Sequence, residues 1–130
     1  MEITNKINSF EELIVWQRAI DLSALAYKRT EKFPKEEVFG LTGQIRRACN
    51  SGSLNISEGS VKTTKGFISQ LVIAHRGVSE VLSASIPASK PGFFIENDLK
   101  DIRSSVSKIT KMLRVNFIIR TENKLELSVI

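Results

Sequence analysis

Metal-binding and disulfide-forming residues are nearly absent from this sequence of 130 residues. A single cysteine, Cys49, excludes an intramolecular disulfide and is compatible with a reducing cytosol. With only one histidine, His75, the chain has too few nitrogen and sulfur ligands to build a zinc site. We therefore expect neither a metal nor a cofactor.

Long apolar runs and a signal pattern are missing as well. The longest apolar runs are about four residues, as in Leu71–Ala74, whereas a helix needs roughly 18 to span a bilayer. Residues Met1–Thr4 show no charged segment followed by an apolar one. Because 42% of the residues are hydrophobic and 25% are charged, the composition predicts a soluble, cytoplasmic protein of one domain spanning 1–130.

The apolar residues that are present recur at spacings of three and four, which is typical of amphipathic helices. They predict helices at about 10–32, 35–59, 64–86 and 97–121. Because the body of the chain shows no strand-like alternation, we predict an all-α, up-down-up-down four-helix bundle. The expected helix ends are a capping box at Ser9–Glu12, Pro34 before the second helix, Gly59 at its end, a break at Pro87, and Asn97 or Asp98 at the fourth helix. The alternating tail Leu125–Ile130 is compatible with an extended segment.

The first predicted helix carries two apolar strips. The Ile20 strip, which we expect to face the core, consists of Leu13, Trp16, Ile20, Ala24 and Tyr27. The Leu22 strip, displaced from it by about 110°, consists of Val15, Ala19, Leu22 and Ala26. We interpret the Leu22 strip as an oligomer interface, because monomers seldom expose a continuous apolar strip. The alternative is that this helix is buried deeply within its own bundle.

Acidic residues are missing from Ile102 to Thr121 in the fourth predicted helix, in a chain whose net charge is +5. Four basic residues fall within about 80° of each other there, and Lys108 flanks them. These four residues are Lys100, Arg103, Lys111 and Arg114. Such a ridge favours binding to a phosphate backbone, because each neutralised phosphate releases counterions. The alternative is a solvated face that keeps the protein soluble.

A nucleic-acid-binding surface follows from the first interpretation. Its predicted phosphate contacts are Arg103, Lys108, Lys111 and Arg114, with Arg46 and Arg47 as secondary contacts. Aromatic residues make up only 7% of the chain and lie mostly on the predicted core stripes. The sequence therefore predicts no platform on which bases could stack.

Catalytic signals are weak. A lone histidine such as His75 is more often a packed or surface residue than a general base, and Cys49 is expected to be a small buried hydrophobe. Glu58 is a single carboxylate without a partner. The chain also lacks a GxxxxGK phosphate-binding loop. We therefore expect no enzymatic activity.

Several motifs in order resemble one protein family. The run Phe10–Ala19 reads FEELIVWQRA. It resembles the opening F-x-x-L-x-V-W-Q-x-A of the 23S rRNA intervening-sequence protein family of bacteria. The segment Asn55–Gly59 reads NISEG and resembles the signature N-I-A-E-G of that family. Further matches are Phe33-Pro34, Glu37, Gly40-Leu41, Gln44–Ala48, Lys65, Phe67, Ile73-Ala74 and Glu80.

The resemblance implies an up-down bundle that assembles into a homo-oligomer, often a ring of five, with RNA or DNA binding as the usual suggestion. Within the signature, Asn55, Glu58 and Gly59 either hold the end of a helix or face a ligand. The leading hypothesis is a non-enzymatic oligomer that binds nucleic acid. The rival hypothesis is a protein-interaction or scaffold module that does not bind nucleic acid.

Overall fold

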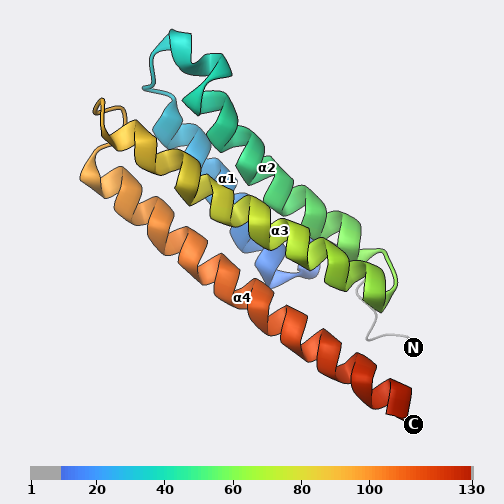
Figure 1. Ribbon diagram of the computed structural model, residues 1–130. Coiled ribbons are helices and arrows are strands. Elements are labelled where there is room, and N and C mark those ends of the chain that lie inside the picture. The colour runs from blue at the N-terminus through green and yellow to red at the C-terminus, as the bar shows by residue number, and fades with distance from the viewer. Residues whose placement is uncertain (1–9, 130) are drawn as a thin grey trace.

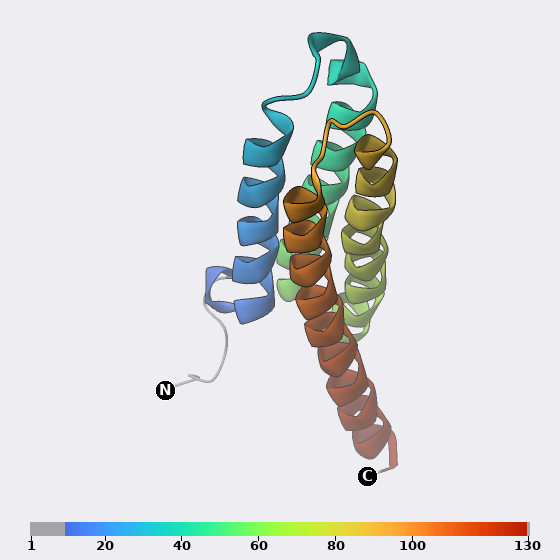
Figure 2. The ribbon, with the colours of Figure 1, turned by 90° about the vertical axis from the view of Figure 1, so that its left-hand side faces the viewer.

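Four antiparallel α-helices make up the body of the protein (Figures 1 and 2). The computed structural model describes residues 10–129, with side chains as far as residue 122. The helices are α1 (Ile14–Thr30), α2 (Leu41–Ser60), α3 (Thr64–Ser85) and α4 (Glu96–Val129). The helices are arranged in a square, in which each helix packs against two others and α4 packs against both α3 and α1. No strand occurs within residues 10–129. The predicted all-α, up-down-up-down bundle is confirmed.

The first two helices begin later than the sequence predicts. A short 3₁₀ turn at Phe10–Glu12 precedes α1, and Ser9 of the expected capping box lies outside the described residues. A second 3₁₀ turn, Lys35–Phe39, follows Pro34. Gly40 then adopts φ −106° and ψ −119°, a non-helical conformation that separates this turn from α2. Pro34 therefore opens a 3₁₀ turn rather than the second helix.

The fourth helix is longer than predicted. It begins at Glu96, and the carboxylate of Asp98 accepts a hydrogen bond from the backbone N–H of Ile95 at 2.9 Å, as in a capping box. It continues to Val129 and runs beyond the end of the bundle (Figure 1). The expectation of an extended tail is therefore wrong for residues 125–129, and Ile130 lies outside the described part.

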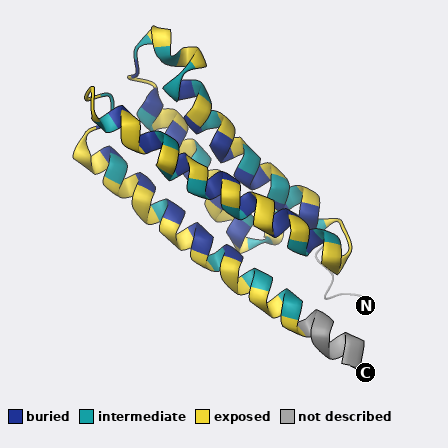
Figure 3. Cartoon of the chain, viewed as in Figure 1, coloured by how far each residue is buried: buried dark blue, intermediate teal, exposed yellow. Residues whose placement is uncertain are grey.

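The fully buried strip of α1 is the Leu22 strip, whereas Leu13 and Trp16 of the Ile20 strip are only partly buried against the core. Every residue of the Leu22 strip is at most 2% exposed within the single chain, whereas Ile20 and Tyr27 of the Ile20 strip are each 38% exposed. The Leu22 strip joins the apolar core that lines the inward faces of the helices (Figure 3). The prediction that it forms an oligomer interface is wrong, because its side chains are already covered. Its two alanines and one valine are small, which lets α1 pack closely on α2 and α4.

The largest helix contact in the bundle joins α2 and α3. A Cβ atom added at Gly77 would lie 3.2 Å from the backbone nitrogen of Gly52, and one added at Gly52 would lie 2.8 Å from Cγ2 of Val78. Glycine at these positions therefore allows the two backbones to approach. Gly59 acts in the same way, since its Cβ would lie 2.7 Å from Cβ of Gln70. It lies within the last turn of α2 and is not the αL cap that the sequence suggests.

None of the described helices combines the length and apolarity needed to cross a bilayer.

Candidate nucleic-acid interface

A groove runs between α3 and α4 and is bounded by two arginines of the predicted ridge. One part has a volume of about 220 Å³ and is lined by Arg103 and Arg114 together with hydroxyl-bearing residues of both helices. The hydroxyl-bearing residues are Ser79, Ser107 and Thr110. Arg103 and Arg114 are 11 positions apart, so three helical turns, or about 16 Å, separate them along α4.

The basic side chains along α4 beside this groove are not neutralised by ion pairs with described side chains. Arg103, Lys111 and Arg114 are exposed, as is Lys100 one turn before Arg103. Among the side chains that the structure describes, none of these four forms an ion pair. These four side chains therefore keep their positive charge and are exposed to solvent.

Arg76 on α3 is a further exposed basic residue that sequence reasoning missed. It does not line the groove itself, but it lies in the sequence between His75 and Ser79, both of which do. Glu80 is the one acidic residue in α3. A projection of α3 at 100° per residue would have indicated Arg76 only if the position of α4 had been known.

The groove continues past Arg114 into an apolar section of about 300 Å³. This section is lined by Leu71, Val72 and Leu113 and by the ring of Phe117, with His75 and Arg114 at the junction of the two sections. Val72 is 43% exposed and Phe117 is partly exposed, so the section is open to solvent. Sequence reasoning placed the aromatic residues on core stripes and missed Phe117. Its spacing of four residues from Leu113 put it at the edge of the stripe.

His75 stands at this junction as a neutral side chain. Burial lowers its pKa from the ordinary value of 6.5, and the positive charge of Arg114 lowers it further. Its Nε2 atom is buried and has no hydrogen-bond partner in the described part of the chain. A buried polar atom without a partner costs on the order of 1–3 kcal/mol of stability.

Lys108 does not belong to the α3–α4 groove. It lies on the opposite flank of α4, where a shallow pocket between α1 and α4 also contains Arg18, Asp21 and Asp101. The carboxylates of Asp21 and Asp101 therefore line the same pocket as Lys108. Arg120 is separate as well, because its guanidinium covers the ring of Phe67 at 4.2 Å and burial lowers its pKa.

Arg46, predicted as a secondary phosphate contact, is occupied within the bundle. Its Nε donates to Oγ1 of Thr30 at 3.0 Å, and its Nη2 donates to the backbone oxygen of Tyr27 at 3.2 Å. Its guanidinium also lies over the Tyr27 ring, 4.5 Å from the centroid. These contacts tie α2 to the end of α1 and occupy Nε and Nη2 of Arg46, which leaves this guanidinium less available to a phosphate.

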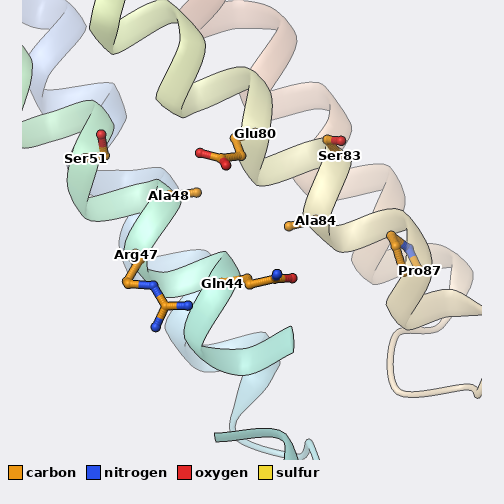
Figure 4. A pocket seen from close by; sticks show the side chains of 8 residues that line it. All are labelled: Gln44, Arg47, Ala48, Ser51, Glu80, Ser83, Ala84 and Pro87. Carbon is orange, nitrogen blue, oxygen red and sulfur yellow. The ribbon is translucent and has the colours of Figure 1, made fainter. Parts of the chain in front are cut away.

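Arg47 lies in a different groove, between α2 and α3 (Figure 4). This groove has a volume of about 540 Å³ and also contains Gln44, Ser51 and Glu80. Figure 4 shows that the carboxylate of Glu80 is directed toward α2, whereas the guanidinium of Arg47 is directed away from Glu80. The groove carries charge of both signs, and the structure does not bring Arg47 together with the ridge on α4.

The signature residues make contacts inside the bundle. The side-chain amide of Asn55 donates to the backbone oxygen of Ser51 at 2.7 Å on its own helix. The carboxylate of Glu58 accepts from Nε2 of Gln70 at 3.4 Å and thereby joins α2 to α3. These contacts favour the structural interpretation of the signature over a ligand-binding one.

Cys49 behaves as a core residue. It is buried, and burial raises the pKa of its thiol to about 12, against a weaker opposite effect of Ser23. The thiolate that nucleophilic chemistry needs is therefore strongly disfavoured at neutral pH.

A family model described as 23S rRNA-intervening sequence protein matches residues 11–115. No curated protein matches the chain. The matched range includes all of α1 to α3 and the part of α4 that carries the basic ridge.

Proposed function

The chain belongs to the 23S rRNA-intervening sequence protein family, and from this premise we propose that it is a non-enzymatic cytoplasmic protein that binds the backbone of RNA or DNA. The binding surface is the α3–α4 face, defined as Arg76, Lys100, Arg103, Lys111 and Arg114. The observation that supports this most strongly is that these basic residues are exposed and form no ion pair with a described side chain, and that residues 102 to 121 include no acidic residue.

Electrostatics determines what such a surface can do. Each cation that neutralises a phosphate releases counterions, so the affinity falls steeply as salt concentration rises. Phosphate contacts carry little sequence information, and the affinity is therefore broad. RNA and DNA of many sequences are expected to bind with similar strength at one salt concentration.

A salt titration of a double variant tests the proposal. Anisotropy measures binding to fluorescein-labelled 20-nucleotide RNAs of several sequences. We expect the double variant, Arg103→Gln with Arg114→Gln, to bind all of these RNAs more weakly and by a similar factor. The slope of log K against log salt should flatten by roughly one unit for each lost contact. The fold should survive, because both side chains are exposed.

The matched control removes the same charge from another surface. Lys28 and Lys35 are exposed residues of α1 and of the turn after it, and neither forms an ion pair with a described side chain. Lys28→Gln with Lys35→Gln should leave the slope almost unchanged. Equal slopes for both variants would contradict a localised α3–α4 face. No binding by the unmodified protein at low salt would favour the scaffold hypothesis.

We further propose that the chain forms a homo-oligomer, with a ring of five subunits as the resemblance implies, through the α1–α2 outer face. This face is defined as Ile20, Tyr27 and Leu54, which are 38%, 38% and 58% exposed. The hydroxyl of Tyr27 accepts a hydrogen bond from Asn50 at 3.0 Å, and Leu54 lies one turn after Asn50, so the face is continuous. Exposed apolar residues grouped in this way are typical of subunit contacts.

Sedimentation velocity tests the assembly. The unmodified protein should sediment as an oligomer, and Leu54→Glu should shift it toward the monomer while the helical circular dichroism signal is retained. Val61→Glu is the matched control, because Val61 is 81% exposed in the turn after α2. An unmodified chain that is monomeric at high concentration would contradict the proposal.

A further inference from the structure

The α3–α4 groove is more than a charged surface, because its chemistry changes along its length. From Arg103 to Arg114 the groove is bounded by these two cations, and its walls combine hydroxyl groups with the apolar side chains of Leu82 and Val106. Beyond Arg114 the groove has no hydroxyl group, and its walls are Leu71, Val72, Leu113 and the ring of Phe117. His75 and Arg114 line both sections, so the two sections are continuous. A ligand that fills the whole groove needs an anionic part and, next to it, a flat apolar part.

We infer that the groove binds single-stranded nucleic acid, with one unpaired base seated in the apolar section beside Phe117, the adjoining phosphate held by Arg114 and a phosphate further along the strand held by Arg103. This inference rests on the proposed function and specifies its partner. The flat base of a nucleotide suits the apolar section, and the charged backbone of the strand suits the two arginines, and this complementarity selects the occupant.

Three features of the apolar section suit a base. Phe117 supplies an aromatic surface, and every base has a face that stacks on such a ring. Val72 and Leu71 supply the opposite wall from α3, so the section is bounded by both helices. The volume of about 300 Å³ lies at the small end of ligand pockets, as a single base requires.

A duplex cannot use this section, because its bases are stacked and paired inside the helix. Its phosphates can still contact the α3–α4 face. We therefore expect two contributions to the affinity. Phosphate contacts contribute for every nucleic acid, whereas the base contact contributes only for strands with unpaired bases.

The test compares strands of equal charge with and without bases. Anisotropy measures binding of the full-length protein to a labelled dA₁₂ strand, to a 12-residue abasic strand of the same phosphate count, and to a 12-base-pair duplex. We expect dA₁₂ to bind the unmodified protein about fivefold to 100-fold more tightly than the abasic strand, the range typical of one stacked base. Phe117→Ala should bring dA₁₂ down to the level of the abasic strand and leave the abasic strand itself unchanged.

Ile118→Ala is the matched control, because Ile118 is the next residue of α4, is 50% exposed and does not line the groove. It should leave both affinities unchanged, and circular dichroism checks that both variants are folded. Equal affinities of the unmodified protein for dA₁₂ and the abasic strand would overturn the inference while leaving backbone binding intact. Failure of all three ligands to bind would overturn the proposed function as well, so the two failures are distinguishable.

Discussion

Asp98 joins the end of α1 to the start of α4. Besides the N–H of Ile95, its nearly buried carboxylate accepts hydrogen bonds from Arg29 at 2.9 Å and from Lys32. Burial by itself raises the pKa of this carboxyl. The hydrogen bonds from Lys32, Ile95 and Arg29 outweigh burial and hold the pKa below its ordinary value of 3.8. The charged form of Asp98 is therefore the one that stabilises the fold.

A substitution at Asp98 should reveal this contribution and its pH dependence. Because the pKa is lower in the folded state, the stabilisation is complete above about pH 4 and is lost as the pH falls through the folded pKa. We expect Asp98→Asn to lower the free energy of unfolding by about 1–3 kcal/mol at pH 7, measured by urea denaturation, and to reduce the loss on acidification to pH 3.

Asp101 provides the control for that experiment. It also accepts a hydrogen bond from Arg29, at 2.7 Å, but its side chain is 48% exposed. Exposed ion pairs contribute little, so Asp101→Asn should cost less than about 1 kcal/mol. If both variants lost the same stability at pH 7, burial of Asp98 would not be the reason for its contribution.

The helices themselves were largely predictable, because apolar spacings of three and four depend only on the local sequence. The number, order and direction of the helices follow from those spacings and from the breaks near Pro34 and Pro87. The inward face of α1 did not follow, because a helix with two apolar strips gives no information about which neighbours cover it. The sequence analysis assigned the Ile20 strip to the core, whereas the structure buries the Leu22 strip.

The candidate site was predictable only in part for the same reason. The basic residues of α4 share one face of one helix, and the sequence alone indicates this. Arg76 and Phe117 belong to the site only because α3 and α4 lie side by side, which is information about tertiary structure. Arg46 looked available because its partners on α1, Tyr27 and Thr30, are 16 to 19 positions earlier in the chain.

The close contact of α2 and α3 makes a prediction at the scale of elements. Alanine at position 77 would place its Cβ 3.1 Å from Oγ of Ser51 and 3.2 Å from the backbone of Gly52. The helices would have to separate, which should cost about 1–3 kcal/mol even though alanine favours a helix by about 1 kcal/mol over glycine.

Thermal denaturation measures this cost. Gly77→Ala should melt at a lower temperature than the unmodified protein, and Ser69→Ala, an exposed change on the same helix, should melt at nearly the same temperature. A higher melting temperature for Gly77→Ala would mean that helix propensity, and not backbone proximity, dominates at this position.

At the scale of the whole molecule, the two proposed surfaces lie on opposite sides of the bundle. Each helix packs on its two neighbours around a square, so the α1–α2 outer face is opposite the α3–α4 face. An assembly through the first face would leave the second face of every subunit open. Repetition of the basic groove around such an assembly would convert weak individual contacts into a higher overall affinity for a long strand.

The location of the nucleic-acid contact on the folded protein is the central claim, and amide chemical-shift mapping tests it most directly. Titration of the ¹⁵N-labelled protein with dA₁₂ at low salt should perturb amides of residues 72–79 in α3 and 103–117 in α4. The amide chemical shifts of residues 14–30 in α1 should not change. Perturbations confined to α1 and α2, or none at saturating strand, would contradict binding through the α3–α4 face.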